Sequence, residues 1–166
     1  ILDLGTGSGC ILLSLLSELP GATGIGSDIS DSALDIARFN SKELGFENRS
    51  EFIRSNWFSD IADKFNVIIS NPPYICREDL LELEADVRDF DPEIALDGGL
   101  DGLDSYRRFI PEVGNHIQNG GWLFLEIGAG QLEGIEQLLE LNGFVTVSKI
   151  SDLAQIWRCV AAKMRF

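Results

Sequence analysis

Several kinds of residue are scarce in this chain of 166 residues, and each scarcity excludes a class of protein. There is one histidine and one methionine, and only 13 basic residues stand against 27 acidic ones, for a formal net charge of -14. Nucleic-acid partners require clusters of lysine and arginine, whereas Arg107-Arg108 is the only adjacent basic pair. The composition therefore predicts no direct binding to nucleic acid.

Cysteine is also rare. Cys10, Cys76 and Cys159 are odd in number, far apart and without a C-x-x-C pair, which predicts a reducing, cytoplasmic compartment and no metal site. Cys10 and Cys159 have apolar neighbours and are expected to be small core residues. Cys76 is no strong candidate for a nucleophile, because the single histidine, His116, offers no recognisable base for it.

Long apolar runs are absent too. No run approaches the roughly 18 residues of a membrane span, and no signal peptide is recognisable. The hydrophobic content of 45% and charged content of 24% are those of a globular protein. We expect residues 1–166 to form one domain and a monomer. Because the chain begins at Ile1 inside an expected strand, we also expect it to be a fragment.

The elements alternate between strand and helix, which predicts an α/β fold with a mostly parallel sheet covered by helices on both faces. Strands are expected over residues 1–4, 23–27, 51–55, 66–70, 122–127, 144–150 and 157–163, the last two as an antiparallel edge hairpin. Helices are expected over 10–19, 31–44, 105–118 and 131–141. Residues 119–121 are expected to form a turn, and residues 86–102 a long acidic loop that is either functional or disordered.

Helical spacing predicts the core faces of two helices. The first face comprises Ala33, Leu34, Ile36, Ala37 and Leu44, after a Ser30 N-cap. The second comprises Tyr106, Phe109, Ile110, Val113 and Ile117.

A glycine-rich turn, Gly5-Thr6-Gly7-Ser8-Gly9, follows the first expected strand. Glycine permits positive φ and close approach of a ligand, and the helix N-terminus behind it favours negative groups. The third glycine of the dinucleotide fingerprint is replaced by Cys10, and no P-loop lysine follows. The G-x-G-x-G spacing resembles class I S-adenosylmethionine-dependent methyltransferases, which implies a Rossmann-like fold and cofactor binding by these five residues. A purely structural turn is the alternative.

Two further segments are candidates for the nucleoside. Asp28 lies 19 residues after Gly9 at a strand end, where an acid can accept both ribose hydroxyls; capping by Ser30 or Asp31 would leave it free. The resemblance implies that Asn56 recognises adenine and that Trp57 stacks on it, although many relatives have aspartate at Asn56. The alternative places Trp57 and Phe58 in the core.

Asn71-Pro72-Pro73-Tyr74 ends the fourth expected strand. Two prolines stiffen the loop at the sheet edge where α/β proteins bind ligands, although Asn-Pro is also common in ordinary turns. The tetrapeptide resembles the signature of methyltransferases that act on a planar nitrogen, in a glutamine amide or a nucleobase amine. This implies that all four residues are catalytic and bind the substrate, and that Asn71 also borders the cofactor.

The segment from Val87 to Arg108 resembles release factor glutamine methyltransferases of the HemK/PrmC type. The resemblance implies methyl transfer to the Gly-Gly-Gln glutamine of class 1 peptide chain release factors, with S-adenosylhomocysteine as product and no metal. The acidic surface, expected to include Asp3, Asp28 and Glu126, suits a cationic sulfonium. Methyltransferases of ribosomal-protein glutamine or of nucleic-acid adenine or guanine are alternatives, as is a non-catalytic binding module.

The sequence departs from this family twice. Relatives carry an amino-terminal helical docking domain that this sequence lacks. Relatives also have Asp-Leu-x-Gly near the end, where this chain has Asp152-Leu153-Ala154-Gln155. The missing glycine leaves the geometry of the final hairpin open.

Overall fold

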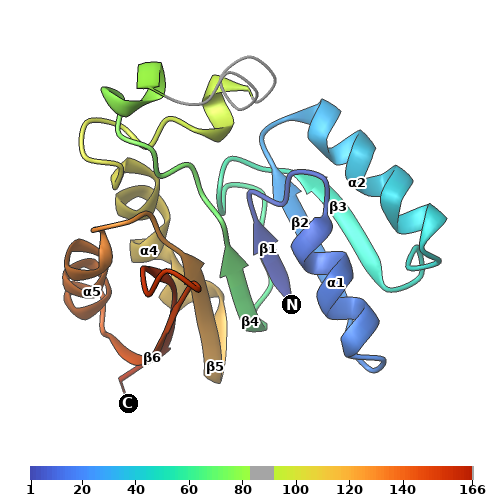
Figure 1. The fold of residues 1–166 in the computed structure, drawn as a ribbon. Helices are drawn as coiled ribbons and strands as arrows, with labels where there is room; N and C mark the ends of the chain where they lie inside the picture. Colours follow the sequence, from blue (N-terminus) through green and yellow to red (C-terminus); the bar gives the residue numbers. More distant parts are fainter. Residues whose placement is uncertain (83–91, 166) are drawn as a thin grey trace. The chain divides into compact units, whose positions relative to one another are not determined.

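The structure, a computed structural model, describes residues 1–82 and 92–165 (Figure 1). These residues belong to two compact units. Unit one comprises Ile1–Ser70 and Asn115–Leu123, and unit two comprises Asn71–Gly114 and Phe124–Phe166. Residues 86–91, which belong to the expected acidic loop and to the segment that carries the family resemblance, lie outside the described residues.

Seven strands form one sheet in the order β3-β2-β1-β4-β5-β7-β6. β1 pairs in parallel with β2 and β4, β2 pairs in parallel with β3, and β6 pairs antiparallel with β7 at the edge. The predicted mostly parallel sheet with an antiparallel edge strand is therefore confirmed. The strands are β1 (Leu2–Leu4), β2 (Gly24–Asp28), β3 (Ser50–Arg54), β4 (Phe65–Ser70), β5 (Ile117–Glu126), β6 (Phe144–Ser151) and β7 (Trp157–Met164).

Two helices pack on the strands of unit one, namely α1 (Cys10–Glu18) and α2 (Asp31–Glu43). Their shared core contains Leu12, Leu13, Leu16, Leu34, Ala37 and Phe52. The predicted N-cap is confirmed, because Ser30 Oγ accepts a hydrogen bond from Ala33 N. Ile36 and Leu44 are instead 53% and 59% exposed, and Cys10 is exposed, so their predicted burial was wrong. These side chains lie on helix faces that turn away from the sheet.

Helices α4 (Asp104–His116) and α5 (Leu132–Leu141) follow the loop region, which holds two short 3-10 helices, η1 (Asp79–Glu82) and η2 (Glu93–Ala95). α5 packs on β6 and β7 within unit two. No helix among the described residues is long and apolar enough to cross a membrane. The predicted core face of α4 is confirmed by the burial of Tyr106, Phe109, Ile110 and Val113, and Ile117 directly after the helix is buried as well.

The junction between α4 and β5 differs from the prediction. The helix ends at His116, and residues 119–121, expected to form a turn, lie within β5. A Cβ on Gly121 would approach the Asn66 carbonyl oxygen to 2.8 Å. Gly121 therefore allows a close approach that a larger residue could not make, whereas Gly120 has open space around it and takes φ +78°.

The final hairpin forms although residues 152–155 contain no glycine. Gln155 takes the left-handed conformation, with φ +62°, in the turn between β6 and β7. Asp152 closes this turn, because its Oδ1 accepts hydrogen bonds from Ala154 N and Ile156 N and its Oδ2 accepts one from Arg158 Nε. These bonds, led by the one from Ile156, hold the pKa of Asp152 below its usual value.

Candidate functional site

The glycine turn has the backbone conformation that its sequence requires. Gly5, Gly7 and Gly9 have φ of +68°, +55° and +79°, a region that costs other residues roughly 1–2 kcal/mol. Thr6 N donates to Ser27 O at 2.9 Å and Gly9 N donates to Thr6 O at 2.9 Å. The turn is therefore fixed to β2 and cannot be an extended linker.

The three glycines differ in what surrounds them. A Cβ on Gly9 would lie 3.2 Å from Ala37 Cβ and from the Phe52 ring, so this glycine permits tight packing of the helix start. Nothing lies within 4 Å of a Cβ placed on Gly5 or Gly7. The space above these two glycines is open to a ligand.

Beneath the turn lies Asp3, whose residue surface is only 1% exposed. Its Oδ2 accepts a hydrogen bond from Thr6 Oγ1 at 2.7 Å, while Oδ1 has no partner among the described residues. Burial raises the pKa of Asp3 to about 6, although the Thr6 hydrogen bond opposes the shift. The expectation that Asp3 belongs to an acidic surface was therefore wrong, and the Thr6 hydroxyl holds the turn.

Asp28 at the end of β2 joins the turn to the start of α2. Its Oδ2 accepts a hydrogen bond from Gly7 N at 2.9 Å, and its Oδ1 accepts one from Ser30 N at 2.9 Å. The sequence predicted a free Asp28, but both of its carboxylate oxygens accept backbone hydrogen bonds. Each oxygen still has a second lone pair. The backbone bonds orient this half-buried carboxylate, which can still accept two neighbouring hydroxyl groups.

The turn after β3 lies beside Asp28, because Ser55 N donates to Asp28 O at 3.0 Å. Asn56 is exposed, and its side-chain amide makes no hydrogen bond in the described part of the chain. Trp57 is half-buried and has φ +55°, a value uncommon for a non-glycine residue. Phe58 is a core residue that stacks on His116 at 4.4 Å, so the core alternative holds for Phe58.

The Asn71–Tyr74 segment begins where β4 ends. Ser70 is the register partner of Leu4, and its hydroxyl donates to Leu4 O at 2.8 Å. Asn71 is exposed, and neither its amide nor the Pro72 carbonyl is hydrogen-bonded within the described residues. The loop thus has two acceptors without a partner among the described residues, one on the exposed Asn71 and one on the buried Pro72, on a backbone stiffened by proline.

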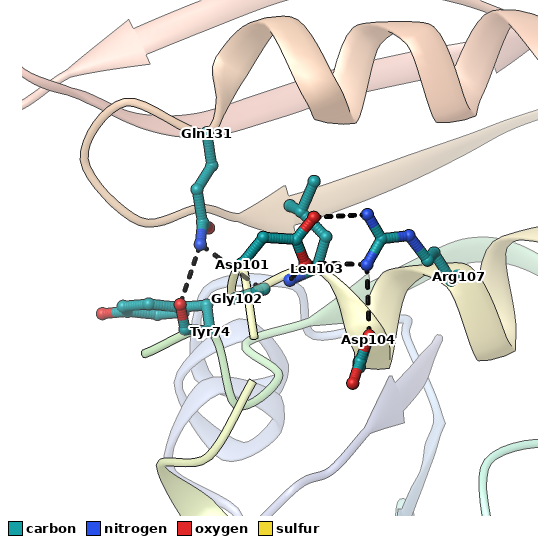
Figure 2. A network of polar contacts seen from close by, with 7 residues as sticks. All are labelled: Tyr74, Asp101, Gly102, Leu103, Asp104, Arg107 and Gln131. Atoms are coloured by element: carbon teal, nitrogen blue, oxygen red, sulfur yellow. Dashed lines mark hydrogen bonds and ion pairs between the residues drawn. The ribbon is translucent and has the colours of Figure 1, made fainter. Parts of the chain in front are cut away.

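Tyr74 is held within unit two at both its ends. Its hydroxyl donates to Glu126 Oε1 at 3.3 Å. Its carbonyl accepts a hydrogen bond from the Gln131 amide at 2.8 Å (Figure 2). Burial, followed by the Glu126 carboxylate, raises the pKa of Tyr74. Gln131 was missed from sequence, because a contact with a residue so distant in the chain leaves no local pattern.

The neighbouring thiol is not activated. Burial and the carboxylates of Asp79 and Asp101 raise the pKa of Cys76, which keeps the thiol protonated at neutral pH. Within residues 1–82 and 92–165, no group of His, Cys, Asp and Glu side chains is placed to hold a metal ion.

The residues of unit one fit a nucleoside-bearing cofactor. The open space over Gly5 and Gly7 admits close approach, Asp28 offers oriented acceptors for ribose hydroxyls, and the exposed Asn56 amide offers an acceptor for an amino group.

Comparison with known proteins shows the family to which the chain belongs. Residues 1–84 match the family model described as Methyltransferase small domain. The chain belongs to this family. The matched range includes the glycine turn, Asp28, Asn56 and the Asn71–Tyr74 segment, so the cofactor and substrate residues predicted from sequence lie inside it.

One relative is the release factor glutamine methyltransferase of Rhodospirillum rubrum, which is 46% identical over 165 residues, covering 99% of this chain and 51% of the relative. The chain spans about half the length of the curated relatives it matches. Among solved structures, a ribosomal protein L11 methylase from Lactobacillus delbrueckii subsp. bulgaricus has a TM-score of 0.73 at 22% identity, covering 99% of this chain and 69% of its own. Magnesium protoporphyrin IX methyltransferase of Synechocystis, solved with bound S-adenosylmethionine, has a TM-score of 0.66 at 18% identity, with coverage of 99% and 69%. These structures establish the class I methyltransferase fold.

Proposed function

We propose that this protein transfers a methyl group from S-adenosylmethionine to the side-chain amide nitrogen of the Gly-Gly-Gln glutamine in class 1 release factors. The observation that carries the proposal is the exposed amide of Asn71 directly after β4, which has no hydrogen-bond partner among the described residues. It occurs in a chain 46% identical to a release factor glutamine methyltransferase. We also propose that residues 1–166 act as one catalytic domain, as a cytoplasmic monomer.

The cofactor is assigned to unit one. Gly5, Gly7 and the backbone of Thr6, Ser8 and Gly9 would hold its amino-acid portion, and Asp28 would accept the ribose hydroxyls. Asn56 and Trp57 would contact adenine, and Asn71 would border the methyl group. When bound, S-adenosylmethionine supplies an electrophilic methyl group, and the new nitrogen–carbon bond is balanced by cleavage of the carbon–sulfur bond with its electrons left on sulfur.

The substrate amide is assigned to the Asn71–Tyr74 segment. An amide nitrogen is a poor nucleophile, because its lone pair is delocalised into the carbonyl. If Asn71 Oδ1 and the Pro72 carbonyl oxygen accept hydrogen bonds from the two N–H groups of the substrate amide, they increase electron density on the amide nitrogen and orient its lone pair. Pro73 keeps the loop stiff and Tyr74 flanks the amide plane.

No strong base is needed in this account. The nitrogen becomes acidic only as it is methylated, so its proton can pass to water. The protonated state of the neighbouring Cys76 thiol is consistent with this, because the thiol is not required as a base.

The test is to incubate the full natural protein, S-adenosylmethionine with an isotopically labelled methyl group, and a class 1 release factor, and to locate the label by mass spectrometry. We expect label on the Gly-Gly-Gln glutamine alone. Label on another residue, or on nucleic acid offered in parallel, would refute the assignment. Calorimetry showing no cofactor binding would favour a non-catalytic module.

A further inference from the structure

Gln131 occupies the N-cap position of α5 without capping the helix. Its backbone has φ -87° and ψ -8°, and its side chain makes no capping hydrogen bond. Glutamine is not among the residues favoured at this position, where serine, threonine, aspartate and asparagine accept from the first turn. The side chain of Gln131 is therefore used elsewhere.

That side chain connects three backbone segments of unit two. Its Nε2 donates to the Tyr74 carbonyl at 2.8 Å and to the Gly102 carbonyl at 3.3 Å (Figure 2). Its Oε1 accepts a hydrogen bond from Gly128 N at 2.9 Å. Only a primary amide can make these three hydrogen bonds, because they require two donors and one acceptor on one flat group.

Glycines make room for this arrangement. A Cβ on Gly102 would collide with Gln131 Nε2 and with the Tyr74 carbonyl oxygen. A Cβ on Gly98 would lie 2.7 Å from Tyr74 Cα, and one on Gly128 would lie 2.8 Å from Gln131 Oε1. The backbone around Tyr74 is thus packed so closely that only small shifts are possible.

The loop that carries Gly102 is itself anchored. Arg107 on α4 forms a bidentate ion pair with Asp101, in which Nη1 lies 2.7 Å from Oδ1. Its guanidinium lowers the pKa of Asp101 to about 2. Leu103 N also donates to Asp101 Oδ1, at 3.2 Å, so the Gly102 carbonyl is presented to Gln131 from a fixed loop.

We propose that Gln131 is a positioning residue for the amide-binding segment Asn71–Pro73, an inference that rests on the proposed function. Pro72 and Pro73 have no backbone N–H, so these two residues cannot be fixed by backbone donors of their own. The Tyr74 carbonyl is therefore the first backbone anchor after the prolines, and Gln131 holds it. Loss of the Gln131 donor would misplace Asn71 without touching any residue assigned to the cofactor in unit one.

The experiment compares three variants in the full natural protein. Gln131→Met keeps the size of the side chain and removes all three hydrogen bonds. Gln131→Glu keeps an acceptor for Gly128 N and replaces the donors by a carboxylate oxygen that faces the Tyr74 and Gly102 carbonyls. Gln137→Met is the matched control, because Gln137 lies on α5 and its hydrogen bond to Glu133, at 3.5 Å, is at the surface.

We expect both Gln131 variants to lower kcat for release factor methylation by about 10- to 100-fold. The cofactor Kd from calorimetry should stay within about twofold and the melting temperature should change little. Hydrogen exchange should accelerate at the amides of Ile75 and Arg77, which donate to Leu96 O and Gly99 O, while β6 and β7 amides are unaffected. Gln137→Met should match the wild type in every readout.

A kcat within twofold of wild type for both Gln131 variants would overturn the inference. So would a loss of activity that is matched by loss of cofactor binding and of thermal stability, because that pattern marks a general structural role. If the wild type transfers no methyl group to the release factor, the proposed function fails instead. Hydrogen exchange at Ile75 and Arg77 then still decides whether Gln131 holds the segment.

Discussion

The buried carboxylate of Asp3 is bound by Thr6 through one oxygen only, at 2.7 Å, and its other oxygen has no partner among the described residues. The pKa of Asp3 is raised to about 6, chiefly by burial. A carboxyl with a raised pKa in the folded state binds a proton more readily there than in the unfolded chain. Its contribution to stability is therefore complete below about pH 4 and is lost as the pH rises through 6.

Asp3→Asn should remove this pH dependence. The substitution leaves a neutral side chain, so its effect on the free energy of unfolding should be more favourable at pH 8 than at pH 4.5, by about 2 kcal/mol. Denaturant unfolding of both proteins at the two pH values measures the difference, and any fixed cost of the new amide cancels. Equal effects at both pH values would show that Asp3 is not the buried titrating group.

Asp28→Asn should weaken cofactor binding. The new amide nitrogen would face a backbone N–H donor of Gly7 or Ser30, and one acceptor for a ribose hydroxyl would disappear. Hydrogen bonds to charged groups contribute roughly 1.5–3 kcal/mol, so calorimetry should show a Kd raised by about 10- to 100-fold. Asp31→Asn is the control, because Asp31 forms only an exposed ion pair with Arg54. Unchanged affinity in Asp28→Asn would remove Asp28 from the cofactor site.

Introducing glycine at position 155, in the turn between β6 and β7, should stabilise the protein. Gln155 has φ +62°, which costs a non-glycine residue roughly 1–2 kcal/mol, and glycine offsets part of that gain through its unfolded-state entropy. Gln155→Gly should raise the free energy of unfolding by about 0.5–1 kcal/mol, seen as a higher denaturant midpoint. Ala154→Gly, without positive φ to relieve, should have the opposite sign. A Gln155→Gly protein less stable than wild type would contradict this reading of the hairpin.

Local patterns were sufficient for much of the fold. Glycine and proline mark strand ends by their backbone restrictions, so the turn at Gly5 and the break at Pro72 were predictable, as was the buried face of α4 that carries Tyr106 and Phe109. The exposure of Cys10 and Ile36 was not predictable, because apolar neighbours in the sequence do not show which helix face packs against the sheet.

The candidate site shows the same division. The residues at strand ends, Asp28 and Asn71 among them, were found from sequence because each lies beside a turn signal. The hydrogen bonds of Asp28 with Gly7 and of Gln131 with Tyr74 join residues 21 and 57 positions apart. Such pairs become visible only when the folded backbone brings them together.

Asn71 allows the central claim to be tested most directly. Wild type and Asn71→Ala would each be given labelled S-adenosylmethionine and a release factor carrying either Gly-Gly-Gln or Gly-Gly-Ala, and the label would be located by mass spectrometry. We predict label on the glutamine nitrogen with wild type only, none on the Gly-Gly-Ala factor, and cofactor affinity of Asn71→Ala within about threefold of wild type. Equal labelling of the glutamine by Asn71→Ala, or labelling of the Gly-Gly-Ala factor, would contradict the account.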